Sequence, residues 1–278
     1  LVPTTYTLKL GGFPWRFRLA NGYAFLRPFF TQTWPLFVAA GLGAVADRST
    51  RRFVALGVPL ALVAYQLGVG GDPWDYWRLA SPGMPVLLVL ALFGTHSAAR
   101  WVLGASQPLR RWITLVALAA QVVLVLTANG RFLPVILLRV APHGVEENRE
   151  TVNAGLAVRA LTHHTASVGV FQAGALPYYS ERPAVDFLGK CDPHIAALAP
   201  DLSGAVAWLG MTTVPGHNKY DLAYSIVERR PTYIEGYAWG RQDLGVWATE
   251  NYEEAFFEGQ RLLFQRASPF VDWRKLRR

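Results

Sequence analysis

Two aspartates and an arginine lie close together between two apolar segments of the chain, at Asp72, Asp75 and Arg78. A carboxylate pair of this kind can hold a divalent cation, orient sugar hydroxyls or act as a general base. The arginine can grip a phosphate or form an ion pair with Asp72. The alternative is a capped, solvated loop with a structural salt bridge. The stretch also contains Gly70 and Gly71 and several aromatic residues.

A second group of polar residues follows an expected strand at residues 183–187. Asp186 ends that strand, and Asp192 and His194 come soon after it. Ligands of α/β sheets usually bind at the carboxyl ends of the strands, so these residues are candidates for a binding site. Helix capping by Asp192 and a surface position for His194 are an equally good interpretation.

A third candidate is the turn Pro215-Gly216-His217-Asn218-Lys219. A turn led by glycine presents backbone amides, and His217 and Lys219 add cationic donors. This combination suits a phosphate or pyrophosphate group.

Metal and nucleotide sites have little support in the sequence. Cys191 is the single cysteine, which excludes an internal disulfide and a cysteine metal cluster. His163 and His164 fall on an expected helix, where neighbouring rings should point apart. There is no His-Glu-x-x-His pattern and no Walker A loop. We predict no metal site, and a divalent cation at Asp72 and Asp75 is the one cofactor that remains open.

Four apolar segments in the first half predict transmembrane helices, at about residues 33–46, 53–69, 84–99 and 112–128. Charged residues fall only at their ends. The chain is 52% hydrophobic and its mean hydropathy is +0.20, which is high for a wholly soluble protein. Residues 14–30 alternate apolar and basic blocks, which fits a helix at the membrane interface or an ordinary amphipathic connector. The first span can also begin earlier, near Ala24.

The placement of arginines predicts how the spans are oriented. The loops at 47–52 and 100–111 carry three arginines each and fall on the same side if all four spans cross. The positive-inside rule makes that side cytoplasmic, so the loop at 70–82 and everything after residue 129 face outward. Membrane topology therefore explains the net charge of +8 better than nucleic-acid binding does.

After Pro142 the pattern changes to short elements. Strands are expected at 167–171, 183–187 and 232–235, helices at 146–163, 221–230 and 251–265, and a short helix or turn at 174–179. This alternation predicts a small α/β domain with a mainly parallel sheet. The expected fold class is a membrane α-helical bundle of about four transmembrane helices (1–139) followed by a small extracytoplasmic α/β domain (140–278).

Several stretches, taken in order, resemble bacterial GT-C-type membrane glycosyltransferases, including terminal arabinofuranosyltransferases and mannosyltransferase-like proteins. The stretches are Pro3-Thr4-Thr5-Tyr6 with Lys9, Gly70-Gly71-Asp72 with Arg78 and Pro82, Gly174–Tyr179 with Asp186 and Asp192–Ala196, and Pro215–Lys219. The similarity covers nearly the whole chain. Two departures are Thr4, where the family has Asn, and Lys190-Cys191, where the family is more apolar.

The resemblance implies transfer of a sugar from a polyprenyl-phosphate donor to an extracytoplasmic acceptor glycan or lipid at the cell (plasma) membrane. It places the catalytic carboxylate in a first external loop upstream of these residues, so this chain is expected to be the carboxyl-terminal portion of such an enzyme. Asp72 and Arg78 would then support catalysis. The residues implied to bind the donor phosphate or sugar are Tyr6, Lys9, Asp72, Arg78, Asp192, His194, His217 and Lys219.

Two other functions remain open on the sequence. One is a non-catalytic, membrane-anchored module that binds a glycan or a partner. The other is part of a transporter, which would show ionisable residues within its spans. The spans here have almost none, and Gln121 is the main polar exception.

Overall fold

The computed structural model describes residues 3–74, 77–101, 104, 106–127, 130, 132–142, 144–208 and 210–276. They form two compact units. The helical unit contains Pro14–Ala141 and Leu209–Met211, and the α/β unit contains Leu1–Phe13, Pro142–Trp208 and Thr212–Arg278. The sequence placed residues 1–139 together in the membrane part, whereas here the first 13 residues belong to the α/β unit.

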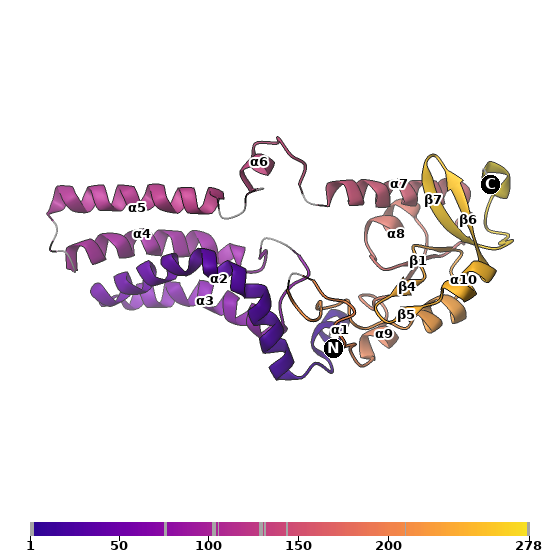
Figure 1. The fold of residues 1–278 in the computed structure, drawn as a ribbon, viewed down its shortest axis with the longest axis horizontal. Coiled ribbons are helices and arrows are strands. Elements are labelled where there is room, and N and C mark those ends of the chain that lie inside the picture. Colours follow the sequence, from indigo (N-terminus) through magenta and orange to yellow (C-terminus); the bar gives the residue numbers. More distant parts are fainter. Residues whose placement is uncertain are drawn as a thin grey trace. The chain divides into compact units, whose positions relative to one another are not determined.

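The helical unit is built from long helices that lie side by side (Figure 1). They are α2 (Trp15–Ala46), α3 (Thr50–Val69), α4 (Met84–Trp101), which the short η1 (Ser81–Gly83) precedes, and α5 (Gln107–Thr127). The short helix α6 (Phe132–Ile136) follows them. Three stretches are long and apolar enough to cross a membrane: Trp15–Ala46, Thr50–Val69 and Ser81–Trp101. They indicate a membrane protein. The fourth expected span, 112–128, falls largely on α5, which is not among these three.

The expected interface helix at 14–30 is not a separate element. It is continuous with the first span in α2, whose 32 residues correspond to about 48 Å, longer than the roughly 30 Å of a bilayer core. Pro28 and Pro35 lie inside α2 without ending it, which neighbouring helices in membrane bundles allow. The chain turns into α3 through Ser49, whose hydroxyl accepts a hydrogen bond from the Arg52 amide.

Helices α2 and α4 approach each other most closely at two glycines. A Cβ atom added to Gly43 would lie 2.2 Å from the Gly94 Cα, and one added to Gly94 would lie 1.8 Å from the Ala39 carbonyl oxygen. Small residues at such crossings let membrane helices pack backbone to backbone.

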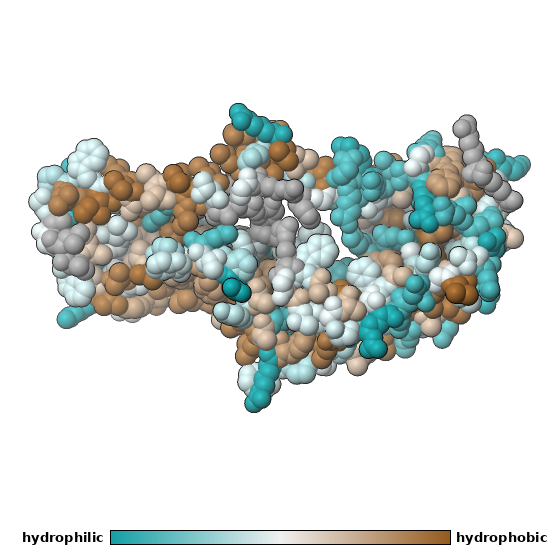
Figure 2. Space-filling view, in the orientation of Figure 1, coloured by the Kyte–Doolittle hydropathy of each residue, from teal (hydrophilic) through white to brown (hydrophobic). Residues whose placement is uncertain are grey.

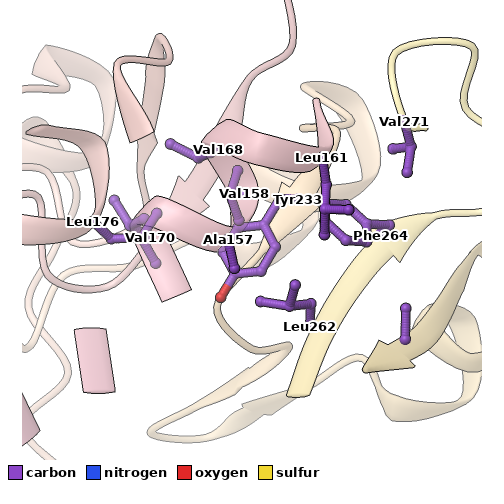
Figure 3. Close-up of a cluster of buried hydrophobic side chains, with 11 residues drawn as sticks. Ala157, Val158, Leu161, Val168, Val170, Leu176, Tyr233, Leu262, Phe264 and Val271 are labelled. Carbon is purple, nitrogen blue, oxygen red and sulfur yellow. The ribbon is translucent and has the colours of Figure 1, made fainter. Parts of the chain in front are cut away.

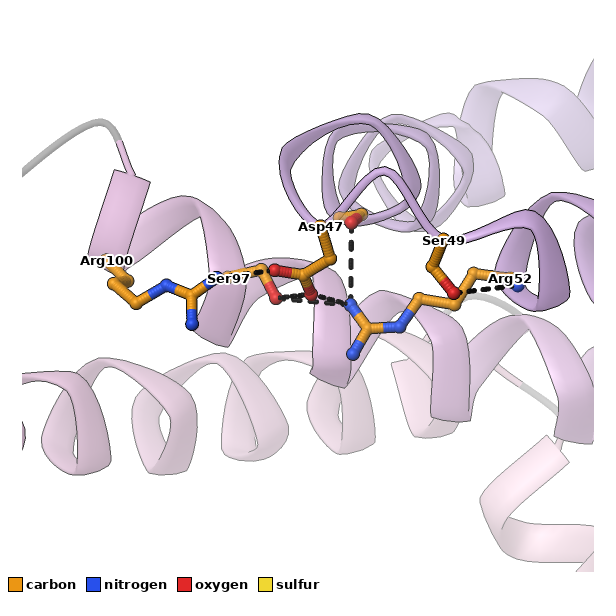
Figure 4. A network of polar contacts seen from close by, with 6 residues as sticks. Asp47, Ser49, Arg52, Ser97 and Arg100 are labelled. Atoms are coloured by element: carbon orange, nitrogen blue, oxygen red, sulfur yellow. Dashed lines mark hydrogen bonds and ion pairs between the residues drawn. The ribbon is translucent and has the colours of Figure 1, made fainter.

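One turn beyond this crossing, Asp47 joins the ends of three helices (Figure 4). Its carboxylate accepts hydrogen bonds from Ser97 Oγ at 2.5 Å, from Arg100 at 2.6 Å and from Arg52. The Ser97 hydroxyl, followed by the two arginines, keeps the pKa of Asp47 below its usual range. We call Asp47, Arg52, Ser97 and Arg100 the helix clip.

Hydropathy separates the two units (Figure 2). Hydrophobic residues cover much of the visible face of the helical unit, and hydrophilic residues cover much of the α/β unit. Helix α5 contributes several exposed large side chains, among them Trp112, Leu115 and Val116, as a helix facing lipid would.

The α/β unit contains α1 (Thr4–Leu10), α7 (Val145–Leu161), β1 (Val168–Val170), α8 (Ala175–Ser180), β2 (Ala184–Asp186), α9 (Pro193–Ala197), the π-helical η2 (Ala223–Glu228), β3 (Tyr233–Ile234), β4 (Ala238–Trp239), β5 (Gln242–Asp243), α10 (Gly245–Asn251), β6 (Tyr252–Phe257), β7 (Gln260–Gln265) and η3 (Trp273–Lys275). The predicted strands at 167–171, 183–187 and 232–235 are confirmed, as are the helices at 146–163 and 174–179.

The main sheet has the order β2-β1-β3-β7-β6. Strands β2, β1 and β3 are parallel, and β7 and β6 add an antiparallel edge. The sheet is therefore mixed rather than mainly parallel. Its core includes Val158 and Leu161 of α7, packed against Val170, Tyr233 and Phe264 of the strands (Figure 3).

The prediction of a helix at 251–265 was wrong. These residues form the hairpin of β6 and β7, in which Phe257 pairs with Gln260. The two turn residues, Glu258 and Gly259, have φ values of 48° and 78°. Positive φ at both central residues is the mark of the two-residue turn that suits twisted strands. In the sequence, Glu258-Gly259 between two apolar runs indicates this hairpin.

Candidate functional site

The loop after α3 holds its shape through glycines and buried polar contacts. Gly70 and Gly71 have φ values of 85° and 97°, a region that side-chain-bearing residues avoid. The Asn21 side-chain amide donates to the Gly70 carbonyl at 2.7 Å. A Cβ atom on Gly71 would lie 2.6 Å from the Met211 sulfur, so this position also needs space.

Asp72 is 1% exposed, whereas the side chain of Arg78 is 50% exposed. Arg78 Nε donates to Oδ2 at 2.9 Å, its Nη2 donates to Oδ1 at 3.1 Å, and the Trp74 amide also donates to Oδ1. The guanidinium lies 5.5 Å from the centre of the Trp74 ring. A buried carboxylate thus fixes the direction of a cation that still meets solvent.

Because both Asp72 oxygens already accept hydrogen bonds, Asp72 is better suited to position Arg78 than to act as a free base. Of the alternatives that the sequence left open, the geometry favours the Asp72–Arg78 pair. Asp75, the second carboxylate of the group, lies outside the described residues. Among described residues, no group of three or more His, Cys, Asp or Glu side chains could hold a metal.

In the α/β unit, the structure brings Lys9 to the predicted turn at 215–219. Gly216, at φ 85°, lies against the Lys9 side chain, and a Cβ there would be 3.4 Å from Lys9 Cε. The His217 carbonyl accepts a hydrogen bond from Trp239 Nε1 at 3.0 Å. Tyr6, on the same helix as Lys9, is 57% exposed.

Lys219 has a structural role in the α/β unit and does not lie on an open binding surface. It is 2% exposed, and its ammonium donates to the Thr7 carbonyl at 3.0 Å and to the Ala196 carbonyl at 2.7 Å. Burial lowers the pKa of Lys219. The side chain fastens α1 to α9, so its implied role at a donor phosphate has no support in this geometry.

Asp192, His194 and Asp186 also follow their structural interpretations. Asp192 Oδ1 caps α9 by accepting hydrogen bonds from the amides of His194 and Ile195, and the His194 ring lies tilted against Tyr224, with 4.3 Å between the ring centres. Asp186 is 4% exposed and accepts the amides of Leu188 and Cys191. These contacts shape the loop that follows β2. Cys191, in the same loop, is exposed.

Two residues that the sequence did not single out lie where Asp186 was expected to act. Lys190 follows β2, and Glu235 directly follows β3. Glu235 Oε2 accepts the Phe171 amide at 2.7 Å and the Gln172 amide at 3.4 Å. Burial raises the pKa of Glu235 and lowers that of Lys190. The signal available was position, since each residue comes just after a parallel strand.

The histidine pair differs from expectation as well. Helix α7 ends at Leu161, so His163 and His164 lie beyond it and not on it. Their rings are 4.0 Å apart, centre to centre, instead of pointing away from each other.

Comparisons with known proteins define a domain but no activity. Residues 142–271 match the model of a family described as a domain of unknown function, DUF8728. The match begins where the long segment of the α/β unit begins, at Pro142. No curated protein and no solved structure matches the chain.

Proposed function

We propose that this chain belongs to an integral-membrane glycosyltransferase of the GT-C type, which transfers a sugar from a polyprenyl-phosphate donor to an extracytoplasmic acceptor glycan or lipid. The observation that carries the proposal is the Asp72–Arg78 pair at the end of α3. A guanidinium held by a buried carboxylate, beside a helix long enough to cross a membrane, is suited to bind a lipid phosphate.

Sugar transfer from a phosphate donor requires a cation of this kind. When a glycosyl bond to phosphate breaks, negative charge grows on the departing phosphate, and a fixed cation stabilises it. Arg78 is held by two hydrogen bonds from its own side chain to Asp72. It therefore needs little reorganisation when that charge develops. A base for the acceptor hydroxyl would come from the upstream loop that the resemblance implies.

The proposed topology has four crossings with the α/β unit outside the cell. Helix α1 precedes all the long helices and yet packs within the α/β unit through Lys219. Two segments of one folded unit lie on the same side of a membrane, so the chain between them crosses an even number of times. With α2, α3 and α4 as spans, α5 supplies the fourth crossing.

Cys191 offers a direct test of this topology, because it is the single cysteine of the 278 residues and is exposed. A membrane-impermeant maleimide applied to intact cells should label it, and Cys191→Ser should remove the label. A Thr5→Cys, Cys191→Ser chain should label equally. If Cys191 is labelled only after the cells are opened, the α/β unit lies inside the cell and the proposed orientation is wrong. If only one of the two positions is labelled on intact cells, they lie on opposite sides of the membrane and α5 is not a fourth crossing.

The activity is tested with the full-length protein in proteoliposomes that contain radiolabelled polyprenyl-phosphate sugars and a cell-envelope acceptor. Arg78→Met should lower transfer by about 10²- to 10³-fold, as loss of one charge-stabilising donor does. Asp72→Asn should lower transfer as well, because Arg78 loses its anchor. Arg100→Met is the matched control, since Arg100 also pairs with an aspartate. Wild-type turnover in Arg78→Met would contradict the proposal.

A further inference from the structure

The carboxyl ends of three parallel strands bring together polar groups that the fold does not use up. Strand β1 lies between β2 and β3 in the sheet. Lys190 follows β2, Phe171 and Gln172 follow β1, and Glu235 follows β3. Parallel strands end at the same edge of a sheet, so these residues share one edge, where ligands of such sheets usually bind.

Glu235 offers a free acceptor at this edge. Its Oε2 atom is fixed by the Phe171 and Gln172 amides. Its Oε1 atom makes no hydrogen bond within the described part of the chain. The backbone amides orient the carboxylate, so one oxygen is presented at a set position without further ordering.

Two lysines, Lys190 and Lys9, supply hydrogen-bond donors for the same site. Lys190 lies within electrostatic range of Lys9, Glu235 and Asp186. Among the described residues, neither the Lys190 nor the Lys9 ammonium takes part in a hydrogen bond or an ion pair. Both side chains are half-buried. An ammonium that is partly removed from water and lacks an internal acceptor gains from an external one.

The charges at this edge decide between kinds of ligand. Lys190 interacts electrostatically with Lys9 and with the carboxylates of Glu235 and Asp186, and Asp186 is buried and occupied by backbone amides. Glu147, on α7, adds a further carboxylate near Glu235 and accepts the Gln172 side-chain amide at 3.3 Å. This edge has no excess of positive charge for a phosphate. A hydroxyl group, which both donates and accepts, satisfies the mixed set.

We propose that Lys9, Lys190 and Glu235 form a binding site for the hydroxyl groups of a neutral saccharide. Glu235 Oε1 accepts from one sugar hydroxyl, and the two ammonium groups donate to others. The apolar neighbours are Phe171 and Trp239, whose rings stack at 4.8 Å. This site lies in the α/β unit and shares Lys9 with the donor-binding residues that the resemblance implies, but it contains neither Asp72 nor Arg78, so its test is separate from that of the transferase activity.

The test measures saccharide binding to the detergent-solubilised 278-residue chain by saturation-transfer NMR and tryptophan fluorescence. The probes are methyl glycosides of mannose, galactose and arabinose, together with inorganic phosphate. We expect saturable binding of at least one glycoside, weakened about tenfold by Glu235→Gln and by Lys190→Met, as for a lost charge-assisted hydrogen bond. Glu250→Gln, at an exposed position on α10, should bind like the wild type.

Glu235→Gln keeps an oxygen that can accept the Phe171 amide, so this variant is expected to fold. Thermal unfolding of each variant separates weakened binding from loss of structure. Saturable binding of phosphate that displaces the sugar, absence of binding to every glycoside, or equal sugar binding by the wild type and a folded Glu235→Gln variant would each overturn the proposal. Phosphate without effect on the sugar signal would support it.

Discussion

Asp47 and Asp72 lie at opposite ends of α3, and each pairs with arginine, but the two arrangements differ in what they leave free. Asp47 gathers Arg52, Ser97 and Arg100, which come from the ends of α3 and α4. Asp72 is more deeply buried and holds a single arginine from its own loop. The first arrangement joins helices to one another. The second gives one cation a direction and leaves half of it open to solvent. Carboxylate–arginine pairs of equal appearance in a sequence can thus differ in structure: one joins three helix ends, and the other orients a single cation from its own loop.

The largest loss of stability should come from Gly94→Val, at the crossing of α2 and α4. Its added side chain would meet the Ala39 backbone, which cannot move away as a flexible side chain does. We expect a loss of about 3 kcal/mol in stability, measured by thermal unfolding in detergent. Gly57→Val is the control, because nothing lies within 4 Å of a Cβ at that position. Equal stability of the two variants would mean that α2 and α4 do not pack at these glycines.

Asp47→Ala should cost about 2–3 kcal/mol of stability, because two arginines and a serine lose their shared acceptor. Asp72→Ala should cost less, about 1–2 kcal/mol, because the half-exposed Arg78 can be solvated by water. Chemical unfolding of both variants in the same detergent gives the ranking. If Asp72→Ala proved the more destabilising, the division between a joining and a directing carboxylate would fail.

Gly71→Ala tests whether the loop around Asp72 depends on its turn. A φ of 97° strains any side chain, so we expect a loss of about 2 kcal/mol and reduced access of Arg78 to its ligand. Gly68→Ala is the control, since its Cβ would meet nothing within 4 Å and alanine favours a helix. Hydrogen exchange of the Gly71 amide, which donates to the Gln66 carbonyl, should rise only in the first variant.

The helix clip should respond to acid. Ser97 and the arginines lower the pKa of Asp47 below that of an ordinary aspartate, 3.8. The folded state therefore holds its proton less tightly than the unfolded state does. The resulting stabilisation is complete above pH 3.8 and is lost as the pH falls through the lower, folded-state pKa. The stability difference between the wild type and Asp47→Asn should shrink in this acid range, and a constant difference would contradict the assignment.

Arg100→Met should have the smallest effect, about 0.5 kcal/mol or less. Its side chain is 56% exposed, and exposed ion pairs contribute little because water and salt screen them. The difference in unfolding free energy between this variant and the wild type should be small at low salt and smaller still at about 1 M salt. A cost close to that of Asp47→Ala would place Arg100 at the centre of the clip.

The parts of the fold that the sequence predicted are those with a single strong pattern. Long apolar helices and the β-branched strands at 167–171 and 232–235 leave few alternatives. The sequence did not predict the hairpin at 252–265, because its apolar residues also fit helical spacing. The turn at Glu258-Gly259 is what distinguishes the two structures. Helix α1 was assigned to the membrane part because nothing local shows that Lys9 and Thr7 meet residues 200 positions away.

The candidate site was predicted by residue type, and the errors follow from that. Asp192 and Lys219 have reactive side chains, but capping and buried carbonyls account for both. Lys190 and Glu235 stand in no recognisable motif, and only the strand order makes them neighbours. Strand order depends on pairing between distant segments, which no single stretch of sequence encodes.

The link from Lys219 to Thr7 sets an order of events during synthesis. A ribosome adds about 5–20 residues per second, so α1 precedes Lys219 by roughly 10–40 s. Throughout that interval the four long helices are emerging, and the buried face of α1 at Leu8 has nothing to pack against. We therefore expect the newly made α1 to be shielded by a chaperone or by the lipid surface until Lys219 is made and the domain can close.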